Sequence, residues 1–157
     1  MVVPRLRCAV ITCLDPRVDP AHVLGLRLSE AIVIRNVGGR VTRDVIEQLA
    51  FLGELADTLL AGDGGPLFEI AVMHHNQCGA GALADEGFRT RYAERIGAPD
   101  PEALRDGAIV DPRETVAVDV ARLREAPELR GRHPISAHVY DVTTGLVTTI
   151  PLRAQGG

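Results

Sequence analysis

The sequence predicts a single α/β domain over residues 1–157, with a central, mostly parallel β-sheet flanked by helices. Apolar runs of strand length alternate with helical patterns, and this order is typical of parallel strands joined by right-handed crossovers. The first run, residues 8–13, lacks polar alternation, as expected of a strand covered on both faces. With 157 residues, 46% of them hydrophobic, the chain is long enough to bury one sizeable core.

The elements that follow the first strand can be placed in order. Asp19 is a candidate cap, and Pro20 the first residue, of a short helix. The apolar run at 31–34 is followed by Gly38 and Gly39, which predict a tight turn with close backbone approach. A longer helix is expected from Thr42, with its buried stripe at Ile46, Leu49, Leu52 or Gly53, Ala56 and Leu59. The remaining elements are strands at 68–73, 138–142 and 146–150, short helices within 85–108, and a helix that Asp111 caps and Pro112 begins.

Composition excludes several classes of function. The net charge of −4 and the lack of a basic run argue against a nucleic-acid partner. All 17 basic residues are arginine, so the chain cannot form a lysine Schiff base or supply a P-loop lysine. No apolar stretch approaches the roughly 20 residues that cross a bilayer, and the N-terminus does not resemble a signal peptide. We therefore expect a cytoplasmic protein without a membrane partner, whose three cysteines stay reduced.

Cys13, His75 and Cys78 are candidate zinc ligands. Cys13 ends the first predicted strand, and His75 and Cys78 follow the third, so parallel strands would bring them to one edge of the sheet. Imidazole nitrogen and thiolate sulfur are ligands that zinc prefers. Three protein ligands leave one position for water, which is typical of a catalytic rather than a structural site, and zinc lowers the pKa of such water enough to give a hydroxide nucleophile. The alternative is that all three are ordinary core residues.

Asp15 and Arg17 are the candidate catalytic pair, because they follow Cys13 directly and Pro16 disfavours a helical backbone at Asp15. Two uses of the carboxylate remain open. Asp15 can accept a hydrogen bond from the zinc-bound water while Arg17 holds it, or it can become the fourth zinc ligand and close the site. A surface ion pair without function is the third interpretation. The other histidines and cysteine of interest, His74, His138 and Cys8, are expected to have structural roles.

Three motifs together resemble the signatures of the β-class carbonic anhydrases. They are Cys13-Leu14-Asp15-Pro16-Arg17-Val18, Arg35-Asn36-Val37-Gly38-Gly39 and His75-Asn76-Gln77-Cys78-Gly79. The resemblance covers nearly the whole chain. It implies one zinc ion per chain on Cys13, His75 and Cys78, an Asp15–Arg17 dyad, reversible hydration of carbon dioxide to bicarbonate, and a homodimer or a dimer of dimers.

Departures from the family pattern keep other functions open. Pro16 stands where the family usually has serine or alanine, and Asn76-Gln77 replaces smaller or acidic residues before Cys78. Relatives of the family hydrolyse carbonyl sulfide or carbon disulfide on the same scaffold. A zinc-binding protein without activity, with Asp15 as a permanent fourth ligand, is a further alternative. A redox protein using Cys13 and Cys78 has less support, because the chain contains no C-x-x-C motif.

Overall fold

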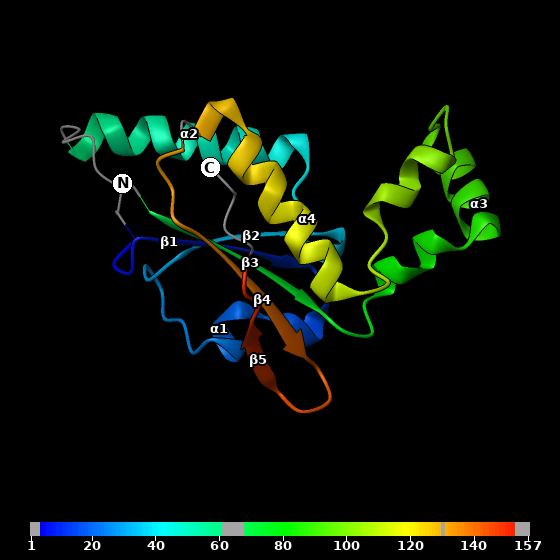
Figure 1. The fold of residues 1–157 in the computed structure, drawn as a ribbon, viewed down its shortest axis with the longest axis horizontal. Coiled ribbons are helices and arrows are strands. Elements are labelled where there is room, and N and C mark those ends of the chain that lie inside the picture. The colour runs from blue at the N-terminus through cyan, green and yellow to red at the C-terminus, as the bar shows by residue number, and fades with distance from the viewer. Residues whose placement is uncertain (1–3, 61–67, 130, 153–157) are drawn as a thin grey trace.

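Five strands form one sheet in the order β2-β1-β3-β4-β5 in a computed structural model of the chain, which describes residues 4–60, 68–129 and 131–152 (Figure 1). The strands are β1 (Cys8–Cys13), β2 (Ile32–Asn36), β3 (Glu69–His75), β4 (Ile135–Asp141) and β5 (Leu146–Thr149). β1 pairs in parallel with β2 and β3, β3 pairs in parallel with β4, and β5 runs antiparallel to β4. The predicted fold class, a mostly parallel sheet flanked by helices, is confirmed.

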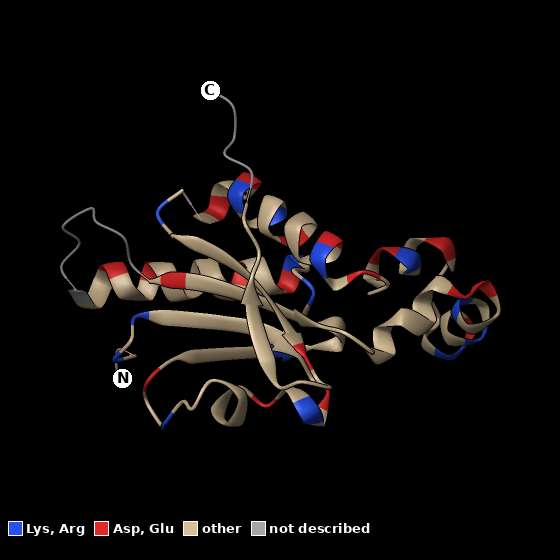
Figure 2. Cartoon of the chain, turned by 60° about the horizontal axis from the view of Figure 1, so that its bottom comes forward, with Lys and Arg blue, Asp and Glu red and all other residues tan. Residues whose placement is uncertain are grey.

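Helices cover the two faces of the sheet unequally. α2 (Arg43–Leu60) and α4 (Pro112–Glu125) lie on one face, and the four-residue α1 (Pro20–Val23) lies on the other (Figure 1). The main core forms under α2 and α4, where Ile11, Leu49, Ile70, Val72 and Val116 are fully buried. Figure 2 shows that the strands carry almost no charged residues, whereas the helices carry many. The apolar interior therefore lies along the sheet, as the uninterrupted apolar run of β1 predicts.

Most predicted caps are confirmed. Asp19 accepts hydrogen bonds from the first turn of α1, and Asp111 accepts from the backbone of Arg113 and Glu114 at the start of α4. Leu59 was expected in the buried stripe of α2, but it is 49% exposed. The last turn of α2 extends past the end of the sheet (Figure 1), so the sheet does not cover that turn. No helix in the described ranges is long and apolar enough to cross a membrane.

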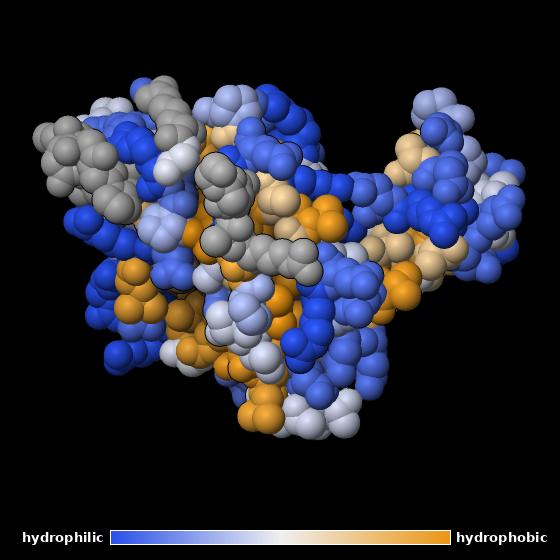
Figure 3. All heavy atoms as spheres, viewed as in Figure 1, coloured by the Kyte–Doolittle hydropathy of each residue, from blue (hydrophilic) through white to orange (hydrophobic). Residues whose placement is uncertain are grey.

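A segment between β3 and α4 projects from the body of the molecule. It consists of η3 (Gly79–Ala84), α3 (Glu86–Ile96) and η4 (Glu102–Gly107), and we call residues 79–107 the arm (Figures 1 and 3). Arg89 is buried within the arm, where it donates to the Leu83 and Ala84 carbonyls and pairs with Glu102. The arm is thus held together internally, and it begins directly after Cys78.

Candidate metal centre

Cys13, His75 and Cys78 come together at the C-terminal edge of the sheet. Cys13 is the last residue of β1 and His75 the last of β3, and these strands are parallel neighbours. One ligand atom from each of the three residues lies within 4.8 Å of the other two. The sheet order therefore brings Cys13 and His75 together, and Cys78 reaches them from the loop that follows β3.

The three side chains fit a zinc ion. The two sulfurs are 3.8 Å apart, and sulfurs bound at about 2.3 Å to one tetrahedral zinc are separated by about 3.8 Å. His75 is fully buried, and its Nε2 atom has no hydrogen-bond partner within the described part of the chain. A buried polar atom without a partner is costly, and a metal ion would satisfy it. The donor set of two sulfurs and one imidazole is one that zinc prefers.

Cys13 is poised as a thiolate. A hydrogen bond from the Cys78 thiol, together with His75 and the backbone amides of Asp15 and Gly38, lowers the pKa of Cys13 to about 4. The same bond between the sulfurs raises the pKa of Cys78, which keeps the proton. A divalent cation bound here would displace the Cys78 proton, because a coordinating thiol is deprotonated.

Asp15 and Arg17 form a pair beside the cluster. Arg17 Nε and Nη2 donate to the two Asp15 carboxylate oxygens at 3.0 and 2.7 Å, and the Arg17 backbone amide donates to Oδ1 at 2.9 Å. These bonds, the side-chain ones foremost, lower the pKa of Asp15 to about 2, so the carboxylate is ionised at neutral pH. Pro16 is the first residue of η1 (Pro16–Val18), which Asp15 caps. The carboxylate is engaged by Arg17 and is not a member of the three-residue cluster.

Arg35 fixes the loop that carries Cys13 and Asp15. Its Nε donates to the Cys13 carbonyl at 3.0 Å, its Nη2 donates to the Asp15 carbonyl at 2.8 Å, and its Nη1 lies 3.3 Å from Asp19. A planar guanidinium can make these bonds together because its donors point in fixed directions. The sequence offered only the position of Arg35 in a motif, and this contact with the dyad loop was not predicted.

Gly39, the second of two glycines after β2, packs against the backbone of β1. Gly38 and Gly39 have φ angles of 77° and 68°, in the left-handed region. A Cβ atom on Gly39 would lie 2.7 Å from the Thr12 carbonyl carbon and 2.8 Å from the Cys13 nitrogen. Asn36 closes this turn, with its side chain bonded to both the amide and the carbonyl of Arg40 at 2.8 Å. The predicted tight turn is confirmed, and it approaches Cys13.

A buried polar network lies behind the cluster, and sequence reasoning missed most of it. His74 is fully buried, and its Nε2 lies 3.2 Å from both the Gly39 carbonyl and the Asp119 carboxylate. Arg40 donates to Asp119 at 2.7 and 3.0 Å, and the Val41 amide donates to it at 3.1 Å. The structural role expected for His74 agrees with these contacts. Asp119 could have been noticed in the sequence only because it falls among the apolar positions that α4 buries, Val116, Val120 and Leu123.

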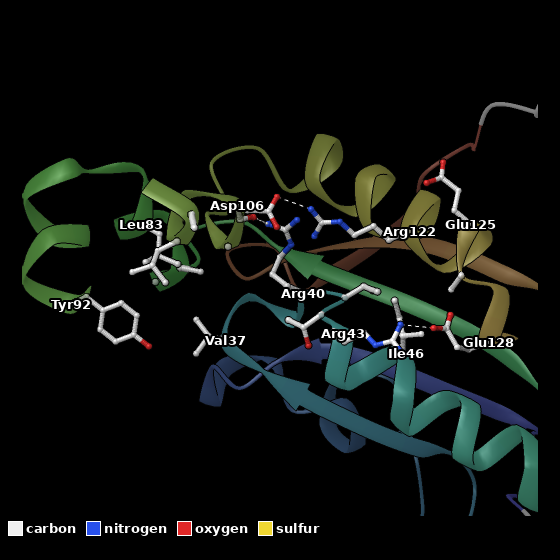
Figure 4. A pocket seen from close by; sticks show the side chains of 18 of the residues that line it. Val37, Arg40, Arg43, Ile46, Leu83, Tyr92, Asp106, Arg122, Glu125 and Glu128 are labelled. Atoms are coloured by element: carbon white, nitrogen blue, oxygen red, sulfur yellow. Dashed lines mark hydrogen bonds and ion pairs between the residues drawn. The ribbon is translucent and has the colours of Figure 1, made fainter. Parts of the chain in front are cut away.

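An apolar groove of about 1050 Å³ opens between the arm and the body, next to the segment that follows Cys78. Figure 4 shows Leu83 and Tyr92 on the arm side and Val37 on the body side. Arg40 donates to the Asp106 and Ala108 carbonyls at the base of the arm. The groove is therefore lined mainly by apolar residues, with the polar residues Arg40 and Asp106 also in its wall.

Comparison with known proteins links this chain to one family. A family model described as carbonic anhydrase matches residues 8–147. "Beta-carbonic anhydrase 1" of Mycobacterium bovis is 31% identical over 150 residues, 94% of this chain and 83% of the relative. A carbonic anhydrase structure from Streptococcus mutans has a TM-score of 0.77 and 35% identity, covering 96% of this chain and 84% of that one. A carbon disulfide hydrolase of Saccharolobus solfataricus is 26% identical over 160 residues, 88% of this chain and 74% of the relative.

Proposed function

Because this chain belongs to the β-class carbonic anhydrase family, we propose that it is a zinc lyase that catalyses the reversible hydration of carbon dioxide to bicarbonate. The observation that carries the proposal is the convergence of Cys13, His75 and Cys78 within 4.8 Å, beside an Asp15–Arg17 pair. These three residues would hold one zinc ion per chain, which supplies a nucleophile from water near neutral pH.

Asp15 and Arg17 would orient the reacting groups. Asp15, ionised at neutral pH, can accept a hydrogen bond from a group that carries a proton. Arg17 fixes the direction in which the Asp15 carboxylate oxygens point. We further propose that Asp15 gates the site as a fourth metal ligand in a closed state. Both carboxylate oxygens are bonded to Arg17, so movement of Asp15 toward the metal would have to change these bonds.

Stopped-flow carbon dioxide hydration, with metal analysis of the same sample, tests the proposal. We expect about one zinc per chain and a rate that rises with pH between about 6.5 and 9, as the gate opens. A zinc-loaded sample without measurable hydration would contradict the lyase function. A flat pH profile in an active sample would contradict the gate alone.

A hydrolase of carbon disulfide or carbonyl sulfide is the second candidate. The observation in its favour is the likeness to a carbon disulfide hydrolase, which is a relative of this chain. Both substrates are linear molecules of similar shape to carbon dioxide, so the same residues would serve. Release of hydrogen sulfide from carbon disulfide by the purified protein would favour the hydrolase over the lyase.

We also propose that residues 1–157 act as one domain and that two copies associate as a homodimer or a dimer of dimers. Support comes from the arm, which stands away from the body and leaves Val37, Phe88 and Tyr92 at 53%, 38% and 36% exposure along the groove. Apolar side chains gathered along an open groove favour coverage by another protein surface. A second copy of the chain is the partner that the family membership supports.

A further inference from the structure

We propose, on the basis of the zinc site proposed above, that the β4–β5 turn fixes the backbone of the metal-binding loop. Asn76 is the positioning residue, because its side chain joins the loop to the turn. The loop comprises residues 75–78, and the turn comprises residues 141–145. Asn76 and the residues of the turn are not members of the three-residue cluster. Their proposed effect is to fix the backbone from which two of the metal ligands project.

Asn76 is bonded to the turn through both ends of its amide. Its Nδ2 donates to Asp141 Oδ1 at 2.9 Å, and its Oδ1 accepts from the Val142 amide at 2.9 Å. Asp141 Oδ1 also accepts from the Thr143 amide at 2.8 Å, so the turn is ordered by the same carboxylate. Hydrogen bonds from the Thr143 amide and from Asn76 lower the pKa of Asp141, which agrees with an ionised acceptor at this point.

The first consequence concerns His75. Its Nδ1 lies 2.8 Å from the carbonyl oxygen of Asn76. A carbonyl can only accept, so Nδ1 must carry the proton, and the neutral ring then has its free lone pair on Nε2. Nε2 is the buried atom without a partner in the described part of the chain, so it is the ring nitrogen left free to bind the metal. The orientation of the Asn76 peptide thus selects the form of His75 that can bind a metal.

The second consequence concerns Arg17. Its Nη2 donates to the Gln77 carbonyl at 3.0 Å as well as to Asp15. Gln77 has a φ angle of 52°, in the left-handed region, which is uncommon for a residue other than glycine. The Gln77 side chain donates to Thr143 Oγ1 at 3.1 Å. The turn therefore holds a strained residue whose carbonyl oxygen helps to aim the guanidinium of the dyad.

Substitutions at positions 76 and 141 can remove or keep the hydrogen bond between Asn76 and Asp141. Asn76→Asp places two carboxylates against each other and breaks the bond to Asp141. Asp141→Asn keeps an oxygen that can accept from Asn76, so it should change little. The double variant Asn76→Asp with Asp141→Asn keeps the net charge of the original chain but does not restore the contact, because an amide nitrogen at 141 that donates to the carboxylate at 76 cannot accept from the Thr143 amide.

The experiment measures the zinc dissociation constant of each full-length variant by competition with a chelator. We expect Asn76→Asp and Asn76→Ala to weaken zinc binding by about tenfold or more, the range found when a residue that supports a metal ligand is removed. Asp141→Asn should stay within about threefold of the original protein, and the double variant should bind zinc as weakly as Asn76→Asp, because it does not restore the bond. An added negative charge beside the site would by itself strengthen cation binding, so a loss in Asn76→Asp has to come from the changed geometry.

Further measurements separate positioning from general destabilisation. Gln48→Ala removes an exposed amide from α2 and is the control, with unchanged zinc affinity expected. Cobalt-loaded Asn76→Asp should show an altered visible absorption spectrum, whereas Asp141→Asn should keep the spectrum of the original protein. The proposal is overturned if Asn76→Ala or Asn76→Asp folds and binds zinc within threefold of the original protein. If the original protein binds zinc but hydrates no carbon dioxide, the proposed function fails, and these affinities still decide the role of Asn76.

Discussion

Arg17 is the residue whose contacts join the two loops of the candidate metal centre. It bonds Asp15 through two nitrogens and the Gln77 carbonyl through one of them. Its guanidinium lies beside the cluster without belonging to it, because its nitrogens are cationic donors that cannot bind a metal. Catalysis and metal binding should therefore respond differently to its removal.

We expect Arg17→Ala to lower the rate of carbon dioxide hydration by about 100-fold, because Asp15 loses the group that orients it. Zinc content should stay near one per chain. Stopped-flow rates and metal analysis check both expectations. Arg27→Ala is a matched control, since Arg27 is an exposed arginine paired with Glu30 away from the cluster. Full activity in the Arg17 variant would remove the dyad from the mechanism.

The sequence was sufficient to identify residues whose side chains can themselves bind a metal. Cys13, His75 and Cys78 belong to residue types that bind zinc, and their placement after strands predicted a common edge. Arg35 and Asp119 could not be found in this way. Each acts through a partner that is distant in sequence, and their roles appear only when the sheet and α4 bring those partners within hydrogen-bond distance.

At the level of elements, the turn between β2 and α2 should be sensitive to a single methyl group. Gly25 and Gly39 both have left-handed φ angles, but a Cβ on Gly25 meets nothing within 4 Å, whereas one on Gly39 overlaps the backbone of β1. We expect Gly25→Ala to lower the free energy of unfolding by about 1 kcal/mol. Gly39→Ala should cost about 2 kcal/mol more. Urea unfolding measures both, and equal losses would contradict the close approach of this turn to Cys13.

The packing of α4 against the sheet depends on one buried carboxylate. Burial alone would raise the pKa of Asp119, but hydrogen bonds from His74 and Arg40 outweigh this and lower it. Asp119→Asn leaves Arg40 with a weaker buried partner and should cost about 3 kcal/mol of unfolding free energy at pH 7. The exposed Asp44→Asn is the control, with a loss of at most about 1 kcal/mol expected, because Asp44 only contributes a charge to the first turn of α2.

The cost of Asp119→Asn should depend on pH in a defined direction. A carboxyl whose pKa is lowered by folding stabilises the fold above its unfolded pKa of about 3.9, and this stabilisation is lost as the pH falls through the folded value. The difference between the original protein and the variant should be constant from pH 5 to 8 and smaller below about pH 4. Urea unfolding across this range measures it. A difference that grows on acidification would contradict the assigned ion pair.

The existence and order of the elements could be predicted more reliably than their limits. β1 has the predicted range, Cys8–Cys13, but β4 begins at Ile135, three residues before the predicted start at His138. β4 starts early because Ile135 pairs with Ile70 of β3, and the position of that partner strand is not encoded locally. Leu59 shows the same limit, since helical periodicity does not say where the sheet beneath a helix ends.

At the scale of the whole molecule, the projecting arm is the feature that the sequence did not predict. Its charged residues and prolines indicated short helices, which are present, but not that they would stand away from the sheet. The resulting groove should be covered by a second copy. We expect Tyr92→Glu to shift the protein toward monomers in sedimentation velocity, because a charge would be buried in the interface. Tyr92→Phe should keep the original state, and an unchanged distribution for Tyr92→Glu would argue against this interface.

X-ray absorption at the zinc edge of the metal-loaded protein tests the central claim most directly. If Cys13, His75 and Cys78 hold the ion, the spectrum should contain two sulfurs at about 2.3 Å and one imidazole nitrogen at about 2.0 Å. Cys78→Ser should leave one sulfur. A shell with no sulfur, or a folded protein that takes up no zinc, would contradict the account.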